Sequence, residues 1–282
     1  MPFLILTTII IFVTLQSITS KQYTNSTPNT KFYLFSGISA FFAMLFFILV
    51  SGFKLSFTPE FIPYSVGFAI SYAASLVGLV FALKYGPLSI TSLITSCSLI
   101  LPAIYGIIFL NDPLKITACI GILCLIAALV LINIKDEEMK FSLRWIICVV
   151  LSFTGNGMCS IVQKMQQVKF SGAYKSEFMI TALLIVCAIL LCASLLSAER
   201  KHKITKPCFY LASIQGLSNG IVNYLVMVLS ALMPVSVMFP MISAGGIILT
   251  IVISIAIYHE KLTKMQITGC LFGIAAVVLL SI

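Results

Sequence analysis

Charge is scarce in this sequence. Only 9% of its 282 residues are charged, and just eight of them are acidic. An ordinary soluble domain carries about a quarter charged residues. A chain that is 60% hydrophobic cannot cover a water-facing surface with so few charges, which excludes a soluble globular protein. We therefore expect an all-α polytopic membrane protein embedded in a lipid bilayer.

The residue types that build catalytic and metal sites are also scarce. The chain has two histidines, and its nine cysteines form no C-x-x-C pair and no Cys/His ligand spacing. His259 and Glu260 are followed by Lys-Leu-Thr, so they do not complete an HExxH motif. A membrane-embedded enzyme would need paired intramembrane acids or a histidine cluster. We expect no enzyme activity, no catalytic residue, no cofactor and no metal.

The distribution of charge excludes two further classes. The net charge of +9 comes from 17 Lys and Arg residues that are scattered through short loops and form no basic face, so we expect no nucleic-acid partner. Every acidic residue lies in a loop or at a predicted helix end. Because proton-coupled carriers use intramembrane carboxylates, a facilitator or a solute exchanger fits better than a proton antiporter.

Long apolar runs make up most of what remains. A membrane-spanning helix needs about 20 mainly apolar residues. Ten such runs occur, at 3–20, 32–51, 61–83, 87–110, 116–134, 143–163, 175–197, 207–230, 233–257 and 264–282. Ten transmembrane helices joined by mostly short loops are predicted.

The two halves of the chain resemble each other. Pro87 and Ser89 align with Pro234 and Ser236. After the insertion of one residue in the second half, NDPLKITACIG (111–121) aligns with HEKLTKMQITG (259–269). This predicts two five-helix repeats, at 1–134 and 141–282. An odd number of spans inverts the second repeat, and inverted repeats around a central cavity are typical of transporters.

These paired segments, with GPLSI (86–90) and MPVSV (233–237), resemble the drug/metabolite transporter superfamily, EamA type. The resemblance implies a basket-like bundle in which the first four helices of each repeat line a cavity and the fifth braces the outside. It implies an exporter or exchanger of a small polar metabolite, such as an amino acid, in the cell membrane, working as a monomer or a homodimer. A flippase of a lipid-linked sugar and a multidrug or cation efflux carrier remain alternatives.

Polar residues within the apolar runs are the candidate substrate-binding residues, since membrane spans expose few polar side chains to lipid. On 207–230, Gln215, Asn219 and Asn223 are spaced four apart on one helix face, and Tyr224 is adjacent. The other candidates are Asn156, Ser160 and Gln163 on 143–163, and Ser71 and Tyr72 on 61–83. The alternative interpretation of all of them is hydrogen bonding between helices.

Three charged residues lie at predicted helix ends, where they could flank a cavity mouth: Lys21, Lys164 and Glu177. Lys21 continues a stripe formed by Thr14 and Ser17. The alternatives are lysines that extend to the membrane interface and a glutamate that pairs with a nearby lysine.

Two local patterns predict structure rather than function. Thr263 and Gln266 have the spacing of a capping box at the start of the last helix. Gly216-x-x-x-Gly220 and Gly269-x-x-x-Gly273 predict close helix contacts inside the bundle.

Overall fold

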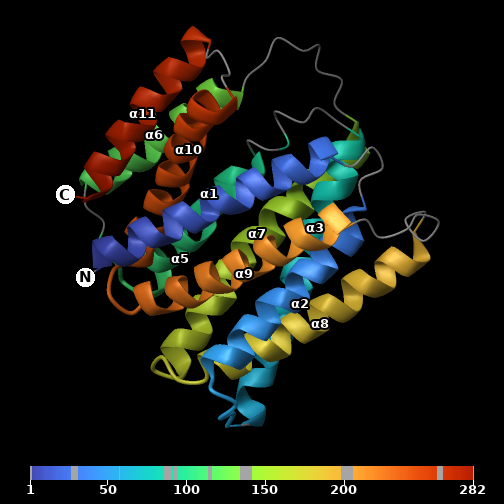
Figure 1. Cartoon of the computed structure of the whole chain (residues 1–282). Helices are drawn as coiled ribbons and strands as arrows, with labels where there is room; N and C mark the ends of the chain where they lie inside the picture. Colours follow the sequence, from blue (N-terminus) through green and yellow to red (C-terminus); the bar gives the residue numbers. More distant parts are fainter. Residues whose placement is uncertain are drawn as a thin grey trace. The chain divides into compact units, whose positions relative to one another are not determined.

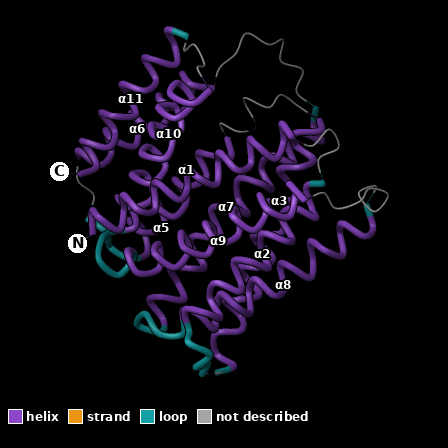
Figure 2. Tube along the Cα trace, in the orientation of Figure 1, coloured by secondary structure: helices purple, strands orange, loops and turns teal. Residues whose placement is uncertain are grey.

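The computed structural model describes residues 2–26, 31–56, 58–85, 91, 94–113, 116–133, 142–197, 206–258 and 263–281. Helices dominate these ranges, and they contain no strand (Figure 2). Seven of the described helices are long and apolar enough to cross a membrane, and the apolar helices at Ile94–Phe109, Ile116–Leu131 and Lys264–Leu279 are shorter. This architecture is compatible with a polytopic membrane protein, while ten spans in an inverted repeat stay a prediction.

Helices follow one another along the described parts of the chain (Figure 1). They are α1 (Pro2–Ser26), α2 (Phe32–Val50), η1 (Pro59–Phe61), α3 (Ile62–Tyr85), η2 (Cys97–Leu99), α5 (Ile100–Phe109), α6 (Ile116–Asn133), α7 (Leu143–Lys169), α8 (Lys175–Leu196), α9 (Lys206–Leu229), α10 (Val235–Tyr258) and α11 (Lys264–Ser281).

Two helices extend beyond the expected bounds. α1 continues to Ser26 rather than ending at residue 20, and α7 continues to Lys169 rather than 163. Hydropathy detects the lipid-facing core of a span, whereas the polar turns that follow keep their helical hydrogen bonds. α7 ends in a Schellman turn, in which Ser171 adopts a left-handed φ of 49° and the Gly172 N–H donates to the Gln167 carbonyl at 2.9 Å.

The fourth expected run, 87–110, falls only partly on described residues. Residues 86–90 and 92–93 lie outside them. The described part is helical from residue 94 to 109 but narrows into the 3₁₀ turn η2 before α5 begins.

The chain forms two compact units. Unit 1 comprises Met1–Leu6, Ala74–Ile161 and Leu232–Ile282, and unit 2 comprises Thr7–Ala73 and Val162–Ala231. Each unit takes elements from both predicted repeats, and three of the boundaries fall inside α1, α3 and α7. The repeat boundary between 134 and 141 stays a prediction.

In unit 2, α2 packs along α8 and α9 (Figure 1). A Cβ added to Gly216 on α9 would lie 2.2 Å from the Ser39 carbonyl oxygen, and one on Gly220 would lie 2.8 Å from the Phe46 ring. Close packing through small residues is the usual way helices associate in membranes. The close contact predicted for Gly216-x-x-x-Gly220 is confirmed, and it lies within the chain.

In unit 1, α6 packs along α11, and α10 contacts α5, α6 and α11. A buried apolar cluster joins three of these helices, formed by Leu125, Leu129, Ala244 and Ala276. The capping box that begins α11 is confirmed: the Thr263 N–H donates to Gln266 Oε1 at 2.9 Å, and the Gln266 N–H donates to Thr263 Oγ1 at 3.3 Å.

Asp112, in the first of the two aligned segments (111–121 and 259–269), has a structural role. Its Oδ2 accepts a hydrogen bond from the Ser236 N–H at 3.0 Å, in the first turn of α10. A carboxylate here satisfies an amide that has no partner within the helix and complements the positive end of the helix dipole. A Cβ on Gly106 would lie 2.5 Å from this oxygen, so only glycine leaves room for the cap. The matching Glu260 lies outside the described residues.

Candidate functional site

The polar face predicted on α9 lies in unit 2 and meets polar side chains from two other helices. Asn219 Nδ2 lies 3.5 Å from Gln16 Oε1 on α1, and Gln163 Nε2 on α7 lies 3.3 Å from Asn223 Oδ1. The Thr19 hydroxyl on α1 contacts the Gln215 side-chain oxygen. We call these six residues, Gln16, Thr19, Gln163, Gln215, Asn219 and Asn223, the amide array.

Backbone carbonyls fix the direction of the side-chain amides in the array. Asn223 Nδ2 donates to both the carbonyl oxygen of Asn219 at 2.9 Å and its Oδ1 at 3.0 Å. Gln163 Nε2 likewise donates to the Asn223 carbonyl oxygen at 3.2 Å. Because a carbonyl oxygen can only accept, both nitrogens must point toward α9. Hydrogen bonds therefore run in one direction, from Gln163 through Asn223 and Asn219 to Gln16.

This direction leaves unused groups at both ends. Gln163 Oε1 accepts no hydrogen bond from any described residue, and Gln16 Nε2 donates none. Gln16, Gln215, Asn219 and Asn223 are all half-buried. In a span surrounded by lipid, a half-exposed amide has to meet water, protein or a solute rather than hydrocarbon. The array therefore has free capacity for a polar partner.

Polar contacts continue along α7 beyond the array. Gln167 is 5% exposed, and its Nε2 donates to Met227 Sδ on α9 at 3.4 Å and contacts Gln166 Oε1. Its Oε1 is buried without a hydrogen-bond donor. A buried acceptor left unpaired is costly, so it marks a position where a water or a ligand donor would be stabilised.

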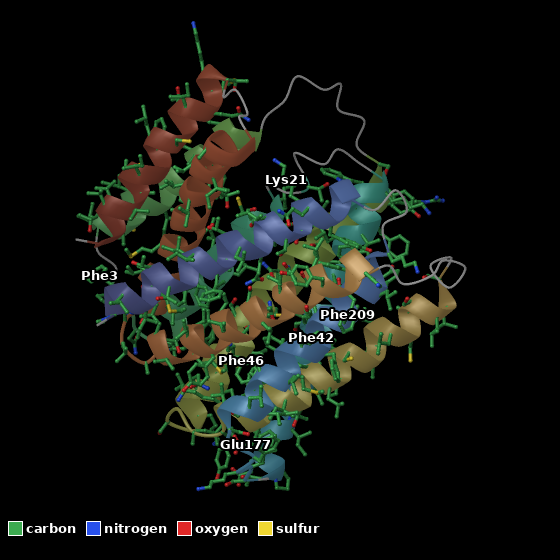
Figure 3. All side chains as sticks on the ribbon, viewed as in Figure 1. Phe3, Lys21, Phe42, Phe46, Glu177 and Phe209 are labelled. Carbon is green, nitrogen blue, oxygen red and sulfur yellow. The ribbon has the colours of Figure 1, made fainter. Side chains whose placement is uncertain are left out.

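The three candidate charges have separate surroundings. Lys164 Nζ donates to the Ser230 carbonyl at 2.5 Å, which caps the C-terminal end of α9. Glu177, at the start of α8, accepts from the Ser56 N–H at 3.0 Å and so anchors the chain before η1. Lys21 lies on α1 (Figure 3), and by helical spacing it shares a face with Thr14 and Ser17 rather than with Gln16 and Thr19. Lys164 and Glu177 thus each bind a backbone group.

Thr14 and Ser17 bond back to their own helix, through Thr14 Oγ1 to the Ile10 carbonyl at 2.8 Å and Ser17 Oγ to the Val13 carbonyl at 3.3 Å. Such bonds satisfy a hydroxyl without a neighbouring helix. The stripe chosen on the first helix is thus not the one that meets α9.

Three other candidates of unit 2 lie away from the array contacts. Tyr224 points into an aromatic cluster of α2, with its ring centroid 6.4 Å from those of Phe46 and Phe47, and Phe42 packs on Phe209 nearby along the same helix pair (Figure 3). Tyr72 on α3 stacks on Phe68 at 5.9 Å, and Ser71 beside it is half-buried.

Unit 1 holds Asn156 and Ser160, with a second polar cluster. Asn156 Nδ2 donates to Ser98 Oγ at 2.6 Å, and that hydroxyl donates to the Thr95 carbonyl at 2.6 Å. Ser75 Oγ donates to the Ser152 carbonyl at 3.2 Å. Ser75, Ser98 and Ser152 are buried, while Ser160 is half-buried. We call Ser75, Thr95, Ser98, Ser152 and Asn156 the hydroxyl cluster.

Gln16 and Thr19 were missed by the sequence reasoning. A pair spaced three apart on an apolar helix was a usable signal, because such residues share a face. The sequence analysis instead chose the stripe of Thr14, Ser17 and Lys21, which includes a charged residue and lies on the opposite side of α1.

Comparison with known proteins identifies the fold alone. No family model and no curated protein matches the chain. A solved structure, titled only as the crystal structure of a protein, superposes with a TM-score of 0.81. The match covers 99% of this chain and 95% of that one at 13% sequence identity. The fold is therefore one that a protein of known structure adopts.

Proposed function

We propose that this chain is an integral membrane transporter that moves a small polar metabolite by facilitation or exchange. The amide array is the observation that carries the proposal. It joins side chains of three helices long and apolar enough to cross a membrane, and its ends have unused hydrogen-bonding groups. Polar groups within a bilayer are costly unless they serve a path or a partner.

Helix pairing supports the further proposal of an inverted repeat of the EamA type. Counted by the predicted spans, α2 and α8 are the second helices of the two repeats, and α6 and α11 are the fifth. Each of these pairs packs together, α2 with α8 and α6 with α11. Equivalent elements pack in pairs when two repeats are related by a two-fold axis. Ten spans and placement in the cell membrane belong to the same proposal.

Counterflow in proteoliposomes tests the proposed function. Vesicles loaded with one unlabelled solute are given the same labelled solute outside, for a panel of amino acids, sugars, nucleosides and lipid-linked sugars. We expect protein-dependent accumulation of at least one water-soluble solute, without a pH gradient. Movement of lipid-linked sugars alone would identify a flippase instead. No counterflow of any solute, from protein that is monodisperse in detergent, would contradict the proposal.

A further inference from the structure

We infer that the amide array binds an uncharged solute that carries both hydrogen-bond donors and acceptors, such as a sugar, a polyol or a nucleoside. The inference rests on the proposed function and names the substrate class of that site. Three features carry it: the unused groups at the ends of the array, the lack of acidic residues on the described parts of its helices, and the unbroken helices that form the array.

The unused groups call for a ligand with mixed hydrogen-bonding character. On the α7 side, Gln163 Oε1 and the buried Gln167 Oε1 are acceptors that receive no hydrogen bond from a described residue. On the α1 side, Gln16 Nε2 is a donor with no acceptor. A hydroxyl or a carboxamide satisfies either end, because it both donates and accepts.

No described residue supplies a countercharge to the array. The described parts of α1, α9 and residues 162–169 of α7 contain no acidic residue, so a cation would lack a carboxylate. For an anion, Lys164 donates to the Ser230 carbonyl, and Lys21 lies on the other side of α1. Lys169 and Lys206 are exposed at the end of α7 and the start of α9. Glu177 is held by the Ser56 N–H. An ion that enters a membrane-embedded site without a countercharge loses its hydration and gains little in return.

Helix termini do not replace the missing charges. In transporters with broken helices, half-helix N-termini receive an anionic substrate group, and unwound carbonyls coordinate cations. Here α1, α7 and α9 run continuously through Gln16, Thr19, Gln163, Gln215, Asn219 and Asn223. Their backbone groups are used within the helices, so only neutral amides and one hydroxyl face the ligand.

Sets of solutes that share a structure but differ in charge test the inference on the wild-type protein. Counterflow is measured for glucose, glucosamine and glucuronate, and for uridine and uridine monophosphate, at neutral pH. We expect at least one neutral probe to move about tenfold or more faster than its charged counterparts. Equal or faster movement of a charged member in every set that is transported would overturn the inference while leaving the proposed function intact. No movement of any probe by protein that still exchanges another solute, such as an amino acid, would overturn the inference alone, and no counterflow of any solute would contradict both.

A designed change of charge gives an independent test. Gln163→Glu places a carboxylate in the array, and we expect the ratio of glucosamine to glucose counterflow to rise by about tenfold. Gln266→Glu is the matched control, because it makes the same change in the capping box of α11, where glutamate also caps. An unchanged ratio in a monodisperse Gln163→Glu protein would overturn the inference. If that variant does not fold, the wild-type probe sets still decide.

Discussion

The amide array of unit 2 and the hydroxyl cluster of unit 1 are both polar groups inside apolar helices, but they differ in how their side chains are paired. Asn156, the one amide of the hydroxyl cluster, is half-buried, as Asn219 and Asn223 are. In the hydroxyl cluster, Ser98 and Ser152 are completely buried, and the Ser75 and Ser98 hydroxyls donate to backbone carbonyls. In the amide array, Gln16, Gln215, Asn219 and Asn223 are half-buried, while Thr19 and Gln163 are buried. Gln163 Oε1 and Gln16 Nε2 at its ends have no partner among the described residues.

The difference separates two roles for polar residues in a membrane bundle. Short hydroxyl side chains that find carbonyl partners let helices approach closely and act as structural links. Larger amides with unused donors and acceptors leave hydrogen-bonding capacity for a solute. Polar residues of both kinds recur at helical spacing, so the two roles are distinguished by whether each donor and acceptor has a hydrogen-bond partner.

The largest expected effect comes from removing the centre of the array. The double substitution Asn219→Leu with Asn223→Leu deletes the link between Gln163 and Gln16, and we expect counterflow to fall about a hundredfold or more. The matched change in unit 1 is Asn156→Leu, which should lower the thermal unfolding midpoint yet keep the KM. A comparable loss of transport in both proteins would remove the distinction between the two clusters.

A second prediction compares glycines in the two units. Gly216→Ala forces a methyl group against the Ser39 carbonyl, and we expect a loss of about 1–3 kcal/mol in stability. A methyl group added by Gly273→Ala in unit 1 would lie 3.4 Å from Ile248 and 3.9 Å from Ala128, which are ordinary contact distances, so this change should be neutral or slightly stabilising. Thermal unfolding in detergent measures both. The reverse order of midpoints would show that α2 and α9 do not pack as closely as described.

A third, smaller effect is expected within the hydroxyl cluster. Ser98→Ala removes the acceptor of Asn156 and one hydroxyl donor, which should cost about 1 kcal/mol of stability. Because this cluster has a structural role in our account, KM for the transported solute should not change. Substrate titration of counterflow checks this, and a several-fold rise in KM would place Ser98 in the binding site.

The smallest expected effect is that of pH. None of the six residues in the array is ionisable, so counterflow of a neutral solute should vary by less than about twofold between about pH 5 and 8. The rate is measured with equal pH on both sides of the vesicle membrane. A steep dependence would mean that a titrating group outside the array controls transport.

The helical class and much of the array followed from the sequence for simple physical reasons. Apolar runs mark helices in lipid, and a spacing of four placed Gln215, Asn219 and Asn223 on one face before any contact was known. Gln163 was found in the same way. These features depend only on local periodicity.

What the sequence did not reveal depends on tertiary packing. α1 carries two polar stripes, one through Gln16 and Thr19 and one through Thr14, Ser17 and Lys21, and only the approach of α9 selects between them. Tyr224 follows Asn223 directly, yet a helical step of one residue turns its ring toward Phe46 and Phe47. Asp112 belongs to a segment that was noted only for its likeness to 259–269, whereas its bond to Ser236 joins segments far apart in sequence.

Cysteine accessibility tests the central claim most directly, because it measures whether the array meets water independently of the substrate's identity. In a background with the nine native cysteines replaced, Asn219→Cys and Ser98→Cys are exposed to a charged, membrane-impermeant thiol reagent in detergent-free vesicles. Our account predicts rapid labelling at position 219, slowed by the transported solute, and no labelling at position 98. Equal labelling at both positions, or none at position 219, would contradict it.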